Sequence, residues 1–533
     1  MLFCGATKLP ADTLRVTTPA MLIVWIVVGI FVFLLLVAIY DVCQRKHAIL
    51  RNFPIVGHFR YILEAIGPEI RQYIVTDNDS ERPFSRDQRR WVYATSKKQN
   101  SYFGFGTDND LENAHDYLII KQSAFPLAEP LPGQPGYDPE YKLPCAKKLG
   151  GYRRRKKAFR PASIVNVSAM SFGSLSSAAT EAINGGCAIA GCLHNTGEGG
   201  IAPYHQKGGD LIWQIGTGYF GCREKDGSFS RQRLIDTIQA NPQIRALEIK
   251  LSQGAKAGLG GMVLGRKVTP EIAAIRGIPA GKDCISPPKH STFHDVDSML
   301  DWVEGLAEET GLPVGIKSAV GEAGFWEELA LKIDTTNRAV DYIAIDGGEG
   351  GTGAAPLVFS DHVALPFKHA FTRVYSCFAE RGIHEKIVFV GSGKLGFPET
   401  ALFAFGLGCD MVAVGREPMM AIGCIQAQRC HTGHCPTGVA THNKWLVRGL
   451  DPTSKSARLA NYVIALRKEL LKLSHACGAQ HPAMVTPDHF EILDGPYSST
   501  NVRELFKYNE AHGLPSDDDQ TKIIRLMDVK KDE

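Results

Sequence analysis

Short apolar runs alternate with helical stretches from about residue 162 onward. Eight of these runs are nearly continuous in apolar character, which is typical of parallel strands buried on both faces. Eight strand–helix units in one domain predict an α/β fold, a closed (β/α)8 TIM barrel, with a doubly wound sheet as the alternative. The predicted strands are residues 163–167, 191–195, 247–251, 283–287, 314–318, 342–346, 386–390 and 410–414.

The segments that follow these strands are polar and rich in glycine. One such turn is ordinary loop chemistry, but eight together favour a barrel, which builds its active site from the loops after its strands. In chain order they read SAMSFGS, NTGEGG, SQGAKAG, SPPKH, SAVGE, DGGEGGTGA, GSGKLG and GREP.

An unbroken apolar segment, 21–40, precedes the barrel and has about the length that a helix needs to cross a membrane. A signal peptide would have a shorter apolar core and an Ala-x-Ala cleavage site, which this segment lacks. The flanking charges are Arg45, Lys46 and Arg51 after the segment, and Lys8 and Arg15, offset by Asp12, before it. This slight bias predicts a single-pass membrane protein whose C-terminal part is cytoplasmic.

Composition limits the class of protein but does not indicate a reaction. Of the 533 residues 44% are hydrophobic and 22% charged, which describes a globular protein, and a formal net charge of +3 gives no reason to expect nucleic acid. The predicted organisation is an N-terminal tail (1–20), a transmembrane helix (21–40), a cap or docking segment (41–160), the barrel (161–487) and a loosely packed C-terminal tail (488–533).

A phosphate site is predicted after the seventh and eighth strands. The segment 391–396 reads GSGKLG, but a Rossmann fingerprint would open its domain rather than follow a seventh strand. In a barrel these two loops commonly bind phosphate. The backbone of Gly391, Ser392 and Gly393, a helix N-terminus, and Gly415–Arg416 suit a phosphate monoester, so a mononucleotide such as FMN is favoured over NAD.

Two lysines favour the same ligand. Lys250 and Lys317 end the third and fifth predicted strands, where a cation stabilises negative charge in a reduced flavin. The alternative is a pair of salt-bridged lysines at the barrel mouth.

Three cysteines, Cys424, Cys430 and Cys435, lie within twelve residues in a C-x5-C-x4-C pattern. A zinc site would need a fourth ligand such as His431 or His434, and the spacing matches no common zinc motif. Three thiolates suit a three-iron cluster, a disulfide is unfavourable in the cytoplasm, and three structural thiols remain an alternative.

Six motifs together resemble the synthase domain of the glutamate synthase large subunit. They occur in the family's order over about residues 160–450, and the whole chain resembles stand-alone FMN-binding glutamate synthase-like proteins of bacteria. The motifs are SAMSFGS (168–174), NTGEGG (195–200), QGAKAGLGG (253–261), ISPPKH (285–290), DGGEGGTGAAP (346–356) and GCIQAQRCHTGHCPTGVAT (423–441).

The resemblance implies a (β/α)8 barrel that binds FMN, with a [3Fe–4S] cluster on the three cysteines. It implies reductive amination of 2-oxoglutarate by ammonia, in which the cluster passes single electrons to the flavin and the flavin delivers a hydride. Lys256 and Arg276 would bind substrate carboxylates, and Glu198 would lie near the ammonia path. The implied flavin contacts are Ala169, Met170, Ser171, Asn195, Gln253, Asp346, Gly347, Gly348, Gly351, Thr352 and Gly353, in addition to the lysines and the phosphate loops.

The chain departs from the family in ways that affect the substrate. It shows no glutaminase segment, so we expect ammonia or an amine to come from solution or another protein. The family pattern QGAKPGEGGQ reads QGAKAGLGGM here, which places Leu259 and Met262 where the family has an acid and a substrate-binding glutamine. Such a change can alter substrate discrimination by orders of magnitude.

Electrons are expected from a partner, either a ferredoxin-like protein or a separate reductase. The basic run 151–160 is a candidate docking site for an acidic carrier or anionic lipid, or simply a solvated face. Two other functions remain open: transfer between glutamate and another amine, as in N-methylglutamate synthesis, and a membrane-bound redox module without amination activity. A homo-oligomer is compatible with the sequence.

Overall fold

The computed structural model describes residues 19–134, 137–510 and 512–532. The chain divides into two compact units, Met1–Arg86 and Asp87–Glu533. This boundary falls inside the segment 41–160 that we expected to form one cap layer. Lys8, Asp12 and Arg15, which contributed to the predicted orientation, lie outside the described residues.

The first unit is helical. Helix α1 (Pro19–Cys43) contains the predicted apolar segment, and the most apolar 18 residues of its stretch Met21–Cys43 have a mean hydropathy of 3.3 and none of them is buried. By length and composition it is the one helix of the described chain that is able to cross a membrane. Two further helices follow, α2 (Ala48–Asn52) and α3 (Gly57–Ile70), and α3 continues into a π-helical turn, Arg71–Val75.

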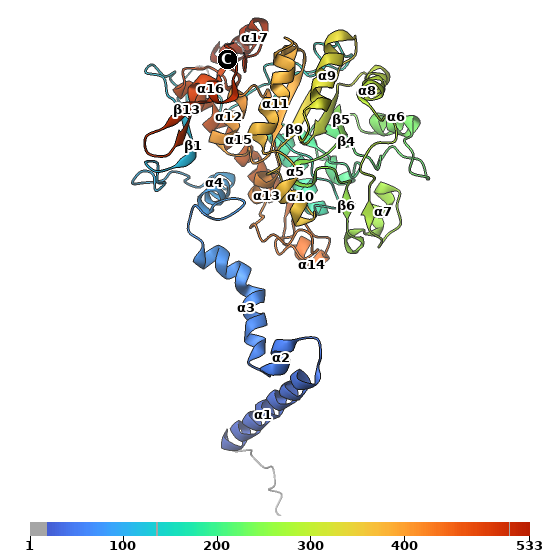
Figure 1. The fold of residues 1–533 in the computed structure, drawn as a ribbon, viewed down its shortest axis with the longest axis vertical. Coiled ribbons are helices and arrows are strands. Elements are labelled where there is room, and N and C mark those ends of the chain that lie inside the picture. The colour runs from blue at the N-terminus through green and yellow to red at the C-terminus, as the bar shows by residue number, and fades with distance from the viewer. Residues whose placement is uncertain (1–18, 135–136, 511, 533) are drawn as a thin grey trace, which may run out of the picture. The chain divides into compact units, whose positions relative to one another are not determined.

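Eight parallel strands form a closed barrel in the second unit, as predicted (Figure 1). Each strand is almost wholly buried, which explains why the strands read as continuous apolar runs. In chain order they are β2 (Val165–Val167), β3 (His194–Asn195), β4 (Leu211–Ile215), β5 (Ile244–Lys250), β8 (Val314–Ser318), β9 (Tyr342–Asp346), β10 (Val388–Ser392) and β11 (Met411–Val414).

One of the eight predicted strands was wrong and one was missed. Residues 283–287 contribute only β7 (Cys284–Ile285), which pairs with β6 (Met262–Val263) in a small antiparallel ribbon outside the barrel. The missing barrel strand is β4, whose sequence LIWQI is as apolar as its neighbours. A short apolar run cannot by itself be assigned to a barrel or to a loop ribbon. As a result, Lys250 ends the fourth strand and Lys317 is the last residue but one of the fifth, and these two strands are direct neighbours.

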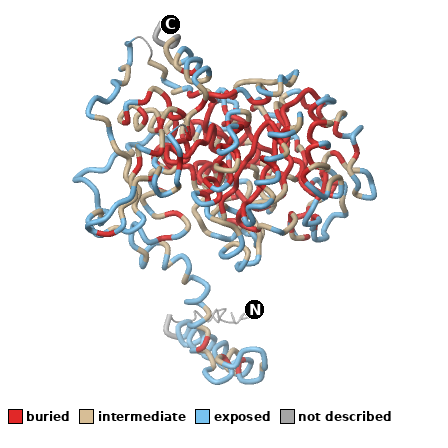
Figure 2. Tube along the Cα trace, turned by 45° about the horizontal axis from the view of Figure 1, so that its top comes forward, coloured by how far each residue is buried: buried red, intermediate tan, exposed pale blue. Residues whose placement is uncertain are grey.

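Helices surround the barrel, and some of them begin at side chains that cap the first turn. Ser176 accepts a hydrogen bond from Ala179 N at the start of α5 (Ser177–Ala190), and Asp295 accepts one from Ser298 N at the start of α8. The other long helices are α6 (Arg231–Ala240), α8 (Val296–Thr310), α9 (Gly324–Thr335), α11 (Phe367–Ala379), α12 (Pro398–Gly406) and α15 (Pro452–Ala476). Figure 2 shows the buried residues concentrated in this body of the molecule.

The C-terminal segment is packed rather than loose. Strand β12 (Phe490–Asp494) pairs with β1 (His115–Ile120) and with β13 (Ser499–Asn501), so a strand of the predicted cap and two of the predicted tail form one sheet. Shorter helices complete the second unit: α4 (Arg86–Ser96), α7 (Pro270–Arg276), α10 (Leu357–His362), α13 (Arg416–Ala421), α14 (Lys444–Val447), α16 (Val502–Phe506) and α17 (Asp517–Asp532).

Candidate active site

One acidic and three basic side chains converge at the C-terminal end of the barrel. Lys250, the last residue of β5, donates from Nζ to Glu198 Oε1 at 2.7 Å and to Gln253 Oε1 at 2.7 Å. Glu198 comes from the loop after β3. Lys256 lies on the turn Gly254–Lys256, and Arg276 ends α7. The barrel thus brings together the three residues that we predicted to act on substrate.

Electrostatics at this cluster are dominated by the cations. Burial acts to raise the pKa of Glu198, but Lys250, Lys256 and Arg276 outweigh it and hold the pKa below its ordinary value. Burial, together with the charge of Lys250, lowers the pKa of Lys256 to about 8. One carboxylate therefore faces three cations, and the cluster has an excess of buried positive charge that suits an anionic ligand.

The guanidinium of Arg276 is buried and only partly used by the protein. Its Nη2 donates to Phe172 O at 2.9 Å, its Nη1 lies 3.8 Å from Cys284 Sγ, and the group lies over the ring of Phe220 at 5.1 Å. Within the described structure, Nε is buried and has no hydrogen-bond partner. A buried donor without a partner is unfavourable unless a ligand completes it.

Glycines bring the backbone close to Glu198. A Cβ atom at Gly216 would lie 2.5 Å from Glu198 Oε2, and one at Gly261 would lie 2.6 Å from Oε1. Any larger residue at these two positions would displace the carboxylate. The glycines of the barrel loops therefore shape the site rather than merely turning the chain.

The second predicted lysine lies beside the first. Lys317 Nζ lies 3.5 Å from Ser168 Oγ and 3.8 Å from Asp346 Oδ1. Asp346, at the end of β9, also accepts a hydrogen bond from Gly254 N at 2.8 Å. The two lysines are thus held by acids at the barrel mouth, where our salt-bridge alternative and our flavin hypothesis both place them.

The glycine loops after β9 and β10 form a cradle at the end of the site where we predicted phosphate. Gly393 adopts a φ of 125°, which favours glycine, and a Cβ there would lie 3.3 Å from Gly347 Cα. A Cβ at Gly351 would lie 2.8 Å from Arg416 Cδ, and Arg416 donates to Glu349 O. Gly415 precedes α13, the helix that starts at Arg416. Glycines and the half-buried Arg416 lie close together in these loops, and this combination fits a mononucleotide phosphate.

Several predicted flavin contacts already have protein partners. Asn195 donates from Nδ2 to Glu248 at 2.8 Å and accepts from Gly197 N at 3.1 Å. Gly348 N donates to Leu365 O at 2.8 Å. The remaining residues lie in the loops of the same barrel end, where the backbone of Ala169, Met170 and Ser171 follows β2 and that of Gly347, Thr352 and Gly353 follows β9.

The three cysteines lie on the loop after α13 and affect one another. Burial, with smaller contributions from the charges of Cys430 and Cys435, raises the pKa of Cys424 to about 12. Among described residues, no three His, Cys, Asp or Glu side chains are placed to hold one metal ion, so the zinc alternative has no geometric support. Cys424, Cys430 and Cys435 are a donor set that would suit an iron–sulfur cluster, because such clusters are held by cysteine thiolates.

The loop after β2, which we expect to contact the flavin, is linked to the cysteine loop through a lysine that the sequence analysis did not identify. Lys267 donates to Ser174 O at 3.0 Å and to Cys430 O at 3.3 Å. Sequence reasoning also missed Glu248, which accepts from Gln214 at 2.6 Å as well as from Asn195, and His290, whose ring bonds Lys250 O at 3.0 Å. A charged residue inside an apolar strand, as in LEIKL, was the signal for Glu248.

The basic run 151–160 lies at the opposite end of the barrel. Arg155 and Arg153 form ion pairs with Glu304 there, and Arg155 also pairs with Asp341, which directly precedes β9. Arg153 and Arg155 are therefore used within the chain, whereas Arg154, Lys156 and Lys157 of the same run are exposed. Docking of an electron carrier at this run stays a prediction.

A family model described as the conserved region in glutamate synthase matches residues 147–480. A glutamate synthase large subunit-like protein of Bacillus subtilis, YerD, is 36% identical over 498 residues, which is 88% of this chain and 94% of that protein. The archaeal glutamate synthase [NADPH] of Methanocaldococcus jannaschii is 36% identical over 324 residues, 59% of each chain. Among solved structures, flavocytochrome b2 with sulfite bound aligns at 12% identity over 86% of this chain and 96% of that chain, with a TM-score of 0.41.

Proposed function

Because this chain belongs to the glutamate synthase family, we propose that it is an oxidoreductase that reductively aminates a keto acid, with 2-oxoglutarate as the first candidate. The observation that supports this most is the excess of cations around Glu198. Lys250, Lys256 and Arg276 are all buried and surround a single carboxylate. A dicarboxylate keto acid would compensate that charge and complete the free Arg276 Nε.

The cofactors in this proposal are FMN and a [3Fe–4S] cluster. When bound, FMN supplies hydride transfer, and the cluster on Cys424, Cys430 and Cys435 supplies single electrons from an external donor protein. Arg416 and the glycines around Gly393 would hold the phosphate. Lys250 and Lys317 would place positive charge at the ring end of the cofactor.

The residues around the substrate have separate tasks in the proposed reaction. Arg276 and Lys256 bind carboxylates and fix the orientation of the keto acid. Lys256, with a pKa near 8, is able to hold or release a proton at Nζ close to neutral pH. Glu198 is held ionised by its neighbours and so accepts hydrogen bonds from ammonia or an ammonium ion at the other side of the site.

We further propose that α1 anchors the protein in a membrane as a single pass, with the barrel unit in the cytoplasm. The support is its length, its hydropathy and the basic residues Arg45, Lys46 and Arg51 that follow it. The electron donor would then be either a cytoplasmic protein or another membrane-associated protein.

A turnover assay with full-length protein, purified without oxygen in detergent, tests this function. The flavin is reduced chemically, then mixed with 2-oxoglutarate and ammonium, and its reoxidation and the product are followed. Rapid reoxidation with glutamate formed is the expected result. Purified protein that carries no flavin would contradict the proposal. A bound reduced flavin that no keto acid and amine reoxidises would also contradict it and would leave the redox-module alternative.

A second candidate is transfer with another amine, and the substrate loop favours it. Leu259 and Met262 provide no hydrogen-bonding side chain, and Met262 is 39% exposed on β6 rather than buried in the site. In the same assay this candidate predicts that methylamine supports faster reoxidation than ammonium does.

A further inference from the structure

Helix α3 carries a stripe of exposed apolar side chains. Phe59, Ile62, Leu63 and Ile66 are each 44% to 67% exposed, and Tyr73 and Ile74 extend the same stripe into the π-helical turn. At 3.6 residues per turn these positions fall within an arc of about 120°. This is the pattern of a helix that buries one side, yet within the described chain that side is open.

Beside the stripe, one side of α3 is charged. Arg60 and Glu64 lie there and form an ion pair at 2.8 Å, with both side chains more than half exposed. Arg71 falls on the same side by helical spacing. The helix therefore has one apolar and one charged face, and only the charged face suits water.

The first turn of α3 is fixed to the last turn of α1. Asp41 is completely buried in α1, accepts a hydrogen bond from Ile55 N at 3.0 Å and lies 3.0 Å from His58 Nε2. The ring of His47 packs edge-on against Tyr61 at 5.4 Å. These contacts hold the start of α3 at the level where the apolar span Met21–Cys43 ends.

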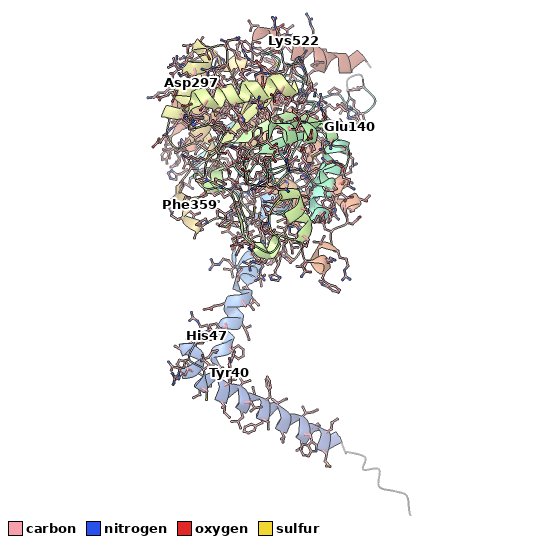
Figure 3. The ribbon with its side chains drawn as sticks, turned by 90° about the vertical axis from the view of Figure 1, so that its right-hand side faces the viewer. Tyr40, His47, Glu140, Asp297, Phe359 and Lys522 are labelled. Carbon is pink, nitrogen blue, oxygen red and sulfur yellow. The ribbon has the colours of Figure 1, made fainter. Side chains whose placement is uncertain are left out.

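From that point α3 runs across the line of α1 instead of prolonging it. Figure 1 and the quarter-turned view of Figure 3 both show this change of direction, with Tyr40 and His47 marking the turn in Figure 3. If α1 crosses a bilayer, a helix that starts at its end and runs across it stays near the lipid surface.

We propose that α3 is an interfacial helix whose apolar stripe lies in the headgroup region of the membrane beside the anchor. This inference rests on the proposed membrane insertion of α1. Amphipathic helices bind lipid by burying one apolar face about 5–10 Å into this region. Arg45, Lys46 and Arg51, between the two helices, add attraction to anionic lipids of about 1 kcal/mol each.

Depth-dependent quenching in vesicles tests the proposal. Full-length protein is reconstituted in vesicles of phosphatidylcholine and phosphatidylglycerol that carry a nitroxide on the lipid near the headgroup. A genetically encoded fluorescent amino acid replaces Ile66 on the stripe, Glu64 on the charged face, or Val27 within α1. The lipid nitroxide is expected to quench the label at 66 several-fold more than the label at 64.

Three outcomes separate the ideas. If nitroxides at no depth in the lipid quench the label at position 27, the anchor itself is contradicted. Quenching at 27 with equal, weak quenching at 64 and 66 would overturn only the interfacial helix. A label at 66 whose emission changes with protein concentration rather than with lipid would show that a second copy covers the stripe, which also overturns the proposal. Ile66→Glu in unlabelled protein is expected to leave membrane insertion intact while abolishing protection of α3 from protease in vesicles.

Discussion

Both ends of the barrel contain buried charges, but the two ends balance them to different degrees. At the N-terminal end, Lys147 pairs with Asp410 at 3.1 Å, and Arg155 pairs with Asp341 and Glu304. At the C-terminal end, Lys317 lies 3.8 Å from Asp346, whereas Lys250, Lys256 and Arg276 share Glu198. Buried ions without partners are costly, so a fold that keeps such a set at one end retains it for something other than stability.

The pKa values show the same contrast. At the balanced end, burial raises the pKa of Asp341 to about 6 although Arg155 opposes the change, and burial raises the pKa of Asp410 against Lys147. At the C-terminal end, the pKa of Glu198 lies below its ordinary value, and the pKa of Lys256 is lowered to about 8. The charged residues at the two ends of the barrel thus have different arrangements, as expected if one face serves stability and the other the proposed function.

Removing a cation from the balanced end has the largest expected effect on stability. Arg155→Met leaves Asp341 and part of Glu304 without compensation, and we expect the free energy of unfolding to fall by about 3–5 kcal/mol. Denaturant unfolding measures this. The matched control is Arg231→Met, which removes the exposed pair with Glu309 and should cost less than about 1 kcal/mol. Equal losses in the two variants would contradict the stabilising role assigned to the buried pairs of Arg155.

Removing a cation from the mouth should affect catalysis instead. Lys256→Gln is expected to lower kcat/KM for the keto acid about 10²–10³-fold, because a preorganised charge toward the substrate is lost. Thermal unfolding should be unchanged or shifted upward, since an uncompensated buried charge is removed. Lys207→Gln, at an exposed pair with Glu181, is the control for kinetics. A large loss of stability in Lys256→Gln would assign that lysine to the fold.

The pH dependence separates stability from binding at one residue. The pKa of Lys256 lies at about 8 in the folded protein against 10.5 for the free side chain. Between these values the unfolded chain binds more protons, so stability should rise with pH, by about 3 kcal/mol at most. Binding of an anionic substrate needs the protonated lysine, so KM should rise above pH 8. Lys256→Gln should lose both trends, and a wild-type profile that is flat in both measurements would contradict this role.

The alternation of apolar strands with glycine-rich loops was sufficient to predict the barrel, because strands buried on both faces leave a direct trace in sequence. The same signal could not show that LIWQI is a barrel strand and that DCISP is not. Over so short a run, a barrel strand and a strand of a small antiparallel ribbon are equally apolar. The C-terminal sheet was also missed, because pairing of β1 with β12 joins residues far apart in the chain.

The site residues came mainly from family motifs, and their partners could not be predicted. The charge at Lys256 is readable from QGAK, but the number of cations around Glu198 depends on where α7 places Arg276. The link from Lys267 to Cys430 O depends on two loops meeting in space. No spacing rule in one sequence encodes such contacts.

Calorimetric titration of the full-length oxidised protein with keto acids tests the central claim most directly. The claim is that the unbalanced positive charge at the barrel mouth binds a dicarboxylate. The account predicts that 2-oxoglutarate binds at least about tenfold more tightly than the monocarboxylate pyruvate, a difference of about 1.4 kcal/mol, and that Lys256→Gln removes this preference. Equal affinity for the two acids, or a preference that survives in Lys256→Gln, would contradict it.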